Sequence, residues 1–505
     1  MHNQKLSRLV APLLLTLILG IAAGLRFYNL NWDSGLFAHP DERSTVAFYA
    51  PTIRWPAASS DFFDPRASTL NPFWDVAADS RRSYTYGHFP LYTLVLTNYL
   101  LHQLAPLAQA VSLPESWVQF LTTVQSSEGY ALVGRALTAL ADLASVYLLF
   151  LIGRRLYGVW GGLLAAALAT FTVLQIQLAH FFAVDPISTT FTLLTIYGSI
   201  LLYDRRSFGA ALLTGLGIGL AVASKFSALP VVAVPVVAGF LASRQPATAT
   251  EPSSSRNPTG TMISLVIIAL VTSFLVFALT SPFVLLDFEN FKIAVLDEQG
   301  AMVSGVADLP FTRQYRGTTA YGYFIEEQLR WGMGWPLGLL ALAGTLWVLV
   351  KTLLGRAQVG ELLGLTWLVV YFGPTGLFLA KFMRYMSPVV PLLTLFGAGL
   401  IVALWRLNPR QLTINNEKLT NLSVPPSTPY IPQSPEPLPL PPPPPPPLPS
   451  NPPVLQPSNP PTFHPSILPS FQNSSPPSWP PPPYSARSSG PWPLSMASIG
   501  PSTPG

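Results

Sequence analysis

The sequence has no cysteine, which excludes disulfide bonds, thiolate nucleophiles and cysteine-bound zinc or iron–sulfur sites. Charge is scarce as well: 10% of the 505 residues are charged, whereas soluble globular domains carry about 25%. Half of the residues are apolar, so a chain of this length cannot cover itself with polar surface. The composition therefore indicates a membrane protein.

Glycine-rich phosphate loops are also missing. Neither a P-loop nor a dinucleotide-binding pattern is present, so no nucleotide site is expected. The net charge of +5 comes from basic residues in short loops, which is a topology signal rather than the footprint of a nucleic-acid partner.

Apolar stretches long enough to approach a membrane span recur along the first 405 residues. The first follows a positively charged start without a clear small-x-small cleavage site, which favours an uncleaved anchor helix over a signal peptide. Together they predict an all-α, polytopic fold of about ten transmembrane helices. The ten stretches are 9–26, 131–153, 159–179, 186–203, 208–224, 227–242, 262–285, 336–354, 361–379 and 385–405.

Basic residues fix the expected orientation. With a cytoplasmic N-terminus, alternating spans put every flanking basic pair on the cytoplasmic side, as the positive-inside rule requires. These pairs are Lys5 with Arg8, Arg154 with Arg155, Arg205 with Arg206, Arg244 with Arg256, Lys351 with Arg356, and Arg406 with Arg410. The outer face then receives the long loops 27–130 and 286–335.

One apolar stretch, 89–107, does not fit as a span. A crossing there would invert every later loop, and its polar breaks at Thr97, Asn98 and His102 suit a helix lying in the membrane interface. From about residue 411 the composition changes, and the last 95 residues hold 32 of the 54 prolines. This tail, 411–505, is expected to be disordered with polyproline II character. A ligand for SH3- or WW-like modules is one interpretation, and a species-specific or frame-altered extension is the favoured one.

Ionisable residues cluster on the expected outer face, where they are costly and tend to be functional. The stretch "SGLFAHPDERSTVAFY" places Asp41 and Glu42 just after the first span, and Asp185 opens the fourth. A carboxylate there suits general-base catalysis, and partial burial is expected to raise its pKa. Cations and polar groups that suit phosphate binding on the same face are Lys225, Lys381, Arg384, Arg82, Tyr86 and His88.

Structural interpretations compete with these functional ones. Asp41 and Glu42, or Asp185 before Pro186, fit the first turn of a helix. Arg384 and Lys225 fit cations that snorkel to the membrane interface.

Several segments together carry a family resemblance over about residues 10–405. They are "FAHPDE", "RALTALADLASVYLLFLIGRRLYG", "AHFFAVDPISTTF", "SKFSALP", "YFIEEQLRWGMGWPLGL" and "KFMRYMSPVVPLL". In their order along the chain and their predicted sides of the membrane, these segments resemble the polyprenyl-phosphate-dependent glycosyltransferases of GT-C type. The resemblance is to the protein O-mannosyltransferase and aminoarabinose-transferase-like branch. The resemblance implies a transferase domain over 1–410.

The resemblance also implies roles for residues. In that family an Asp–Glu pair in the first outer loop carries the catalytic carboxylate, which implies Asp41 as general base with Glu42 positioning it or sharing its role. Asp185 corresponds to the second acid, and Lys225 and Arg384 to ligands of the lipid phosphate. Metal use varies in the superfamily, so a divalent metal is left open, with His39, Asp41, Asp185 and His88 as candidate ligands.

This sequence departs from the mannosyltransferase-like pattern at one place. Those members carry Pro-Pro-Leu and then a lysine in the first loop, whereas "HFPLY" here has one proline and no lysine. Phosphate binding by a lysine at this point is therefore not expected, and His88 or Arg82 could substitute.

The predicted function is transfer of a sugar from a polyprenyl-phosphate carrier to an acceptor hydroxyl, at the outer face of a plasma (inner) membrane. The acceptor is left open among a lipid, a glycan and a protein. Alternatives are a transporter or lipid flippase, which predicts midplane charges and an internal repeat, and a non-catalytic lipid-binding subunit.

Overall fold

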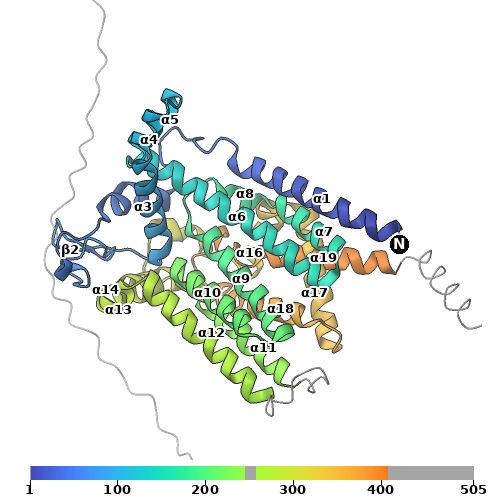
Figure 1. Cartoon of the computed structure of the whole chain (residues 1–505). Coiled ribbons are helices and arrows are strands. Elements are labelled where there is room, and N and C mark those ends of the chain that lie inside the picture. Colours follow the sequence, from blue (N-terminus) through green and yellow to red (C-terminus); the bar gives the residue numbers. More distant parts are fainter. Residues whose placement is uncertain (1, 245–257, 408–505) are drawn as a thin grey trace, which may run out of the picture. The chain divides into compact units, whose positions relative to one another are not determined.

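The computed structural model of the protein describes residues 2–244 and 258–407 (Figure 1). Within these ranges helices account for nearly all regular structure, and one short hairpin pairs β1 (Trp74–Asp75) with antiparallel β2 (Ser80–Arg81). The predicted all-α membrane fold is confirmed. The proline-rich tail, together with Arg256 and Arg410 of the basic pairs, lies outside the described residues.

Each of the ten predicted apolar stretches coincides with a helix or a broken pair of helices. The long elements are α1 (His2–Phe27), α6 (Ser127–Tyr157), α7 (Val159–Thr170), α8 (Val173–Ala179), α9 (Val184–Arg205), α10 (Phe208–Ser224), α11 (Ala233–Ser243), α12 (Pro258–Thr280), α17 (Trp335–Leu353), α18 (Val359–Thr375) and α19 (Val390–Arg406).

Six helical segments of the described chain are long and apolar enough to cross a membrane, and a seventh results if α7 and α8 form one span bent by 63°. Three further apolar helices, α10, α18 and α19, are shorter than 18 residues. The protein is a multi-pass membrane protein, and ten crossings stay a prediction.

The remaining elements belong to short connections and to the two long loops predicted to be outer, 27–130 and 286–335, which keep the names first and second outer loop. In the first outer loop these are α2 (Pro40–Ser44), η1 (Thr45–Tyr49), η2 (Ala50–Thr52), η3 (Ser59–Asp61), α3 (His88–Gln103), α4 (Ala105–Ala110) and α5 (Glu115–Thr123). Further along the chain are η4 (Phe226–Val232), α13 (Phe283–Leu286), α14 (Phe288–Phe291), η5 (Lys292–Glu298), α15 (Gln299–Ser304), η6 (Pro310–Tyr315), α16 (Gly322–Glu327), η7 (Gln328–Gly332) and η8 (Met383–Met386).

The first outer loop lies at the end of the helix layer away from the N-terminus. There, α3 and β2 gather with α13 and α14 (Figure 1). The apolar stretch predicted to lie in the interface is split into α3 and α4, and α3 runs across the ends of the long helices instead of along them (Figure 1). This orientation agrees with an interfacial helix.

The core between the long helices consists mainly of small and branched apolar side chains, together with aromatic ones such as Trp367. In it, α6 packs on α7 and α9, α10 lies between α9 and α12, and α17 packs on α19. One buried ion pair crosses it: Arg26 Nε of α1 donates to Asp142 Oδ2 of α6 over 2.5 Å, and the rest of the guanidinium donates to backbone carbonyls that include Thr170 O. Both side chains are buried, so this pair fixes α1 against α6 and α7.

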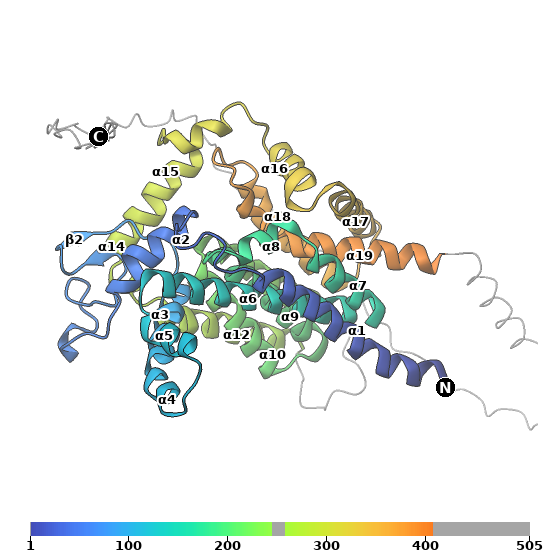
Figure 2. The ribbon, with the colours of Figure 1, turned by 90° about the horizontal axis from the view of Figure 1, so that it is seen from above.

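A continuous helical arm runs over residues 288–304, made of α14, the π-helix η5 and α15 (Figure 2). It ends at Gly305, whose backbone is left-handed with φ 81°. Val303 O accepts a hydrogen bond from Leu379 N, which ties the end of the arm to the segment after α18. π-Helical turns recur at functional sites, and this arm forms one wall of the cavity described next.

Candidate active site

A cavity of about 920 Å³ opens at the end of the helix layer away from the N-terminus. Its walls come from α2 and η1, the segment 83–86, the start of η4, the helical arm 288–304, the end of α18, and the segment 378–385. Segments far apart in sequence therefore meet here. Of the predicted site residues, it is lined by Asp41, Tyr86, Lys225 and Arg384.

Asp41 lies in the first turn of α2, a helix that starts with Pro40 after the extended residue His39. Proline suits this first position because its missing N–H has no helical partner there, and acids are favoured in a first turn. The predicted helix start and the predicted functional position thus coincide. The short helix directs the carboxylate into the cavity.

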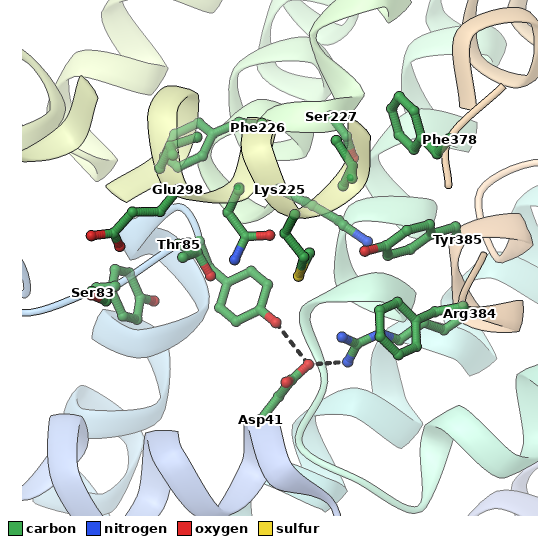
Figure 3. Close-up of a pocket in the computed structure, with 18 of the residues that line it drawn as sticks. Asp41, Ser83, Thr85, Lys225, Phe226, Ser227, Glu298, Phe378, Arg384 and Tyr385 are labelled. Atoms are coloured by element: carbon green, nitrogen blue, oxygen red, sulfur yellow. Dashed lines mark hydrogen bonds and ion pairs between the residues drawn. The ribbon is translucent and has the colours of Figure 1, made fainter. Parts of the chain in front are cut away.

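The Asp41 carboxylate is held by two donors. Tyr86 Oη donates to Asp41 Oδ2 over 2.7 Å, and Arg384 forms a short ion pair with the same oxygen (Figure 3). Burial alone would raise the pKa of Asp41, but Arg384, Tyr86 and His39 together outweigh it and hold the pKa below its ordinary value. The expected upward shift is therefore wrong, because the pairing with Arg384 was not foreseen.

Asp185 and Lys225 form a second acid–cation pair beside the first. Asp185 is in the first turn of α9, as predicted, and its Oδ1 accepts from Lys225 Nζ over 2.6 Å. Lys225 ends α10 in an extended conformation, and its ammonium lies 4.9 Å from the centre of the Tyr385 ring. Lys225, Tyr385 and Arg384 thus gather on one side of the cavity, opposite Glu298, Ser83 and Thr85 (Figure 3).

The position of Arg384 is set by a buried polar network behind it. Ser387 Oγ donates to Gln175 Oε1 of α8 over 2.9 Å and shares a 3.0 Å hydrogen bond with Thr189 of α9. Gln175 Nε2 donates in turn to Ser387 O. These contacts fix η8, and with it Arg384, against the helix layer.

Glu42 points away from the cavity and is fully buried. Both its oxygens accept from Arg135 of α6 over 2.7 Å, and Oε1 also accepts from Phe182 N. Arg135 contacts Asp33 as well, over 2.8 and 3.0 Å. This arrangement favours positioning of α2 by Glu42 over a shared catalytic role.

Sequence reasoning missed Arg135 and Asp33. A signal was present, because Arg135 interrupts the apolar run 131–153, and an ionisable residue within a span is a candidate for a functional site. Asp33 had no such signal, since polar residues are common in an outer loop.

Three predicted phosphate ligands lie elsewhere. Arg82 is paired with Asp75 over 2.5 Å and donates to Thr52 Oγ1. His88 is buried among aromatic rings, and burial lowers its pKa to about 3. Lys381 is buried and has no hydrogen bond or ion pair among residues 2–244 and 258–407, and burial lowers its pKa. None of the three lines the cavity.

The residues present do not fit a divalent metal. Within the described chain no three His, Asp or Glu side chains converge on one point. Asp41 and Asp185 are each paired with a cation, and Arg384 and Lys225 would repel a metal placed between them. His39 packs against Phe181 with the two ring planes tilted and their centroids 4.6 Å apart, and the pKa of His39 is lowered, chiefly by burial.

Comparison with known proteins agrees with the predicted resemblance. Residues 116–285 match the family model of dolichyl-phosphate-mannose-protein mannosyltransferases. The structure is similar to the oligosaccharyltransferase AglB from Archaeoglobus fulgidus in complex with an inhibitory peptide and a dolichol-phosphate, with TM-score 0.52 and 14% identity over 82% of this chain and 52% of that one. The chain shares the fold of this oligosaccharyltransferase.

A second solved structure is ArnT from Cupriavidus metallidurans bound to undecaprenyl phosphate, with TM-score 0.44 and 16% identity over 81% of this chain and 63% of that one. The chain described here spans about half the length of the oligosaccharyltransferase. No curated protein sequence matches it. The family match includes Asp185 and Lys225, whereas Asp41 and Arg384 lie outside it.

Proposed function

We infer that this protein is a membrane glycosyltransferase that moves a sugar from a polyprenyl-phosphate carrier to an acceptor hydroxyl. One observation carries the inference: a candidate base, Asp41, and two cations, Arg384 and Lys225, line one cavity at the end of the helix layer away from the N-terminus. The family match and the dolichol-phosphate of the similar oligosaccharyltransferase support this donor class.

The proposed reaction is a single displacement. Asp41 Oδ2 takes the proton of the acceptor hydroxyl while the acceptor oxygen bonds to the anomeric carbon. The bond from that carbon to the phosphate oxygen breaks, and its electron pair leaves with polyprenyl phosphate, whose charge Arg384 and Lys225 stabilise. Attack opposite the leaving group inverts the sugar's configuration.

The proposed location follows from orientation. With a cytoplasmic N-terminus, the cavity faces the outer side of a plasma (inner) membrane, within a transferase domain over 1–410. The acceptor is then a lipid, a glycan or a protein of the cell envelope.

The experiment that tests the function is transfer of labelled sugar in membranes that contain the full chain. A panel of polyprenyl-phosphate sugars is compared with nucleotide sugars of the same labels. Transfer from one lipid-linked donor and from no nucleotide sugar is expected. Transfer from nucleotide sugars would contradict the donor class, and donor translocation without release of polyprenyl phosphate would favour a flippase.

The acid limb of kcat/KM for a phosphodiester donor is expected below about pH 4, because the pKa of Asp41 in the free enzyme lies below its ordinary 3.8. A base works when it is deprotonated, so activity persists as the pH falls until it reaches this depressed pKa. The measurement is kcat/KM against pH, with unfolding followed in parallel. An acid limb above pH 5 with intact protein would contradict the pairing of Asp41 with Arg384.

A further inference from the structure

Both cations expected to bind the donor's phosphate already form an ion pair with a carboxylate. Arg384 is paired with Asp41, and Lys225 with Asp185. A phosphodiester that enters the cavity would therefore either share these cations with the carboxylates or displace one carboxylate. Which pair opens decides the state of the base.

The two pairs differ in how readily they open. The side chains of Lys225 and Asp185 are 12% and 2% exposed, whereas those of Arg384 and Asp41 are 19% and 23% exposed. Removing the cation from a fully buried carboxylate carries a large desolvation penalty. Asp41, in contrast, keeps partial access to water, so the Arg384 pair opens at lower cost.

Arg384 also has a donor to spare. Its Nε–H is buried and has no hydrogen-bond partner within the part of the chain that the structure describes. A guanidinium binds a phosphate through two parallel N–H groups, Nε–H and one Nη–H among them. In the structure one Nη is held by Asp41. A turn of the guanidinium toward a phosphate would satisfy the orphaned Nε–H and release the carboxylate.

We propose that the donor's phosphate and Asp41 compete for Arg384, so that binding of the carrier itself frees the general base. This inference rests on the proposed function and adds an order of events to it. Before the donor binds, Arg384 weakens Asp41 as a base. Once Arg384 holds the phosphate, Tyr86 still orients the carboxylate through its 2.7 Å hydrogen bond, and Oδ2 can accept the acceptor's proton.

Among the groups around Asp41, Arg384 is the partner that a phosphate would draw away. The charged and titratable side chains that face it from the packed elements are His39, Glu42, Tyr86, Asp185, Lys225 and Arg384. Glu42 is committed to Arg135 and Lys225 to Asp185, and burial lowers the pKa of His39 and raises that of Tyr86.

The test measures binding of a methyl diester of farnesyl phosphate to the full chain in lipid nanodiscs at pH 7. The diester does not titrate near neutrality and has no sugar to transfer. Asp41→Asn removes the competing charge, so it should bind the probe about tenfold tighter than the wild type. Arg384→Gln should weaken binding, and in the double variant the gain from Asp41→Asn should disappear, which is a coupling that a double-mutant cycle measures.

The matched control is Glu298→Gln, which neutralises another carboxylate that lines the same cavity but is paired with Arg81. It should change the affinity by less than about twofold, since exposed pairs contribute little. Equal tightening by Asp41→Asn and Glu298→Gln would show a general charge effect and overturn the exchange. Unchanged affinity in Asp41→Asn would overturn it too.

Two further measurements keep the proposal testable if Asp41→Asn fails to fold. Tyr86→Phe keeps both charges and removes one donor from Oδ2, so Arg384 should be held more tightly and the probe should bind a few-fold more weakly. With a turned-over donor, the acid limb of kcat should lie above that of kcat/KM, because the bound enzyme has lost the Arg384 contact. Coinciding limbs would overturn the exchange, whereas a wild type that does not bind the diester at all would overturn the proposed function with it.

Discussion

Asp41→Asn is expected to lower the rate of sugar transfer by a factor of about 10³, the middle of the range for a general base. Asparagine keeps the shape of the side chain and can still accept a hydrogen bond from Tyr86, but it cannot take a proton from the acceptor hydroxyl. The loss should therefore fall on kcat. Donor binding should persist, since the carboxylate competes with the donor and does not hold it.

A matched control for this prediction is Asp79→Asn. Asp79 lies in the same outer loop, is exposed and sits at a left-handed position with φ 46°, where asparagine is tolerated as well as aspartate. Transfer should stay within about twofold of the wild type, as for surface substitutions in general. The measurement is single-turnover transfer at saturating donor, with protein levels checked. Retention of a tenth or more of the rate by Asp41→Asn would assign the base elsewhere.

Arg135→Met is expected to lower the free energy of unfolding by about 3–5 kcal/mol, because it leaves the carboxylates of Glu42 and Asp33 without their cation in a buried site. The change also removes the restraint on the short helix that carries Asp41, so transfer should fall even in the folded fraction. Urea or detergent titration of the purified protein in micelles measures the first effect.

Two comparisons separate the buried charges from the general effect of losing an arginine. Arg330→Met removes an arginine whose partner Glu326 is about half exposed, so its cost should stay below about 1 kcal/mol. Combining Arg135→Met with Glu42→Gln should recover part of the stability, since one stranded charge is gone. If Arg135→Met lowered the free energy of unfolding no more than Arg330→Met does, the pairing of Arg135 with Glu42 and Asp33 would not contribute to stability.

The helices could be predicted well because the length and composition of an apolar stretch are visible in the sequence itself. The ranges 131–153 and 262–285, for example, lie on α6 and α12 with shifts of a few residues. These properties depend only on residues close together in the chain, so no knowledge of the tertiary packing is needed to recognise them. Residue type and membrane side also placed Asp41, Lys225 and Arg384 on one face, and they line one cavity.

Pairing within that face was beyond sequence reasoning. Arg384 meets Asp41 across 343 positions, and Arg135 meets Glu42 across 93, so both contacts depend on how distant segments pack. For the same reason the sequence did not show that Arg82 is taken by Asp75 or that His88 is enclosed by aromatic rings. That Asp41, Lys225 and Arg384 lie together was predictable, whereas the partner of each residue was not.

The ion pair between Arg26 and Asp142 has a consequence for biosynthesis. Its two residues are 116 positions apart, and at ordinary translation rates the second leaves the ribosome on the order of ten seconds after the first. During that interval we expect the first helix to carry an unpaired guanidinium in its last turn, where a long side chain can reach the polar headgroups. We expect α1 to be inserted first with Arg26 at the level of the headgroups. It would pack into the helix layer only after α6 is inserted and Asp142 can pair with Arg26.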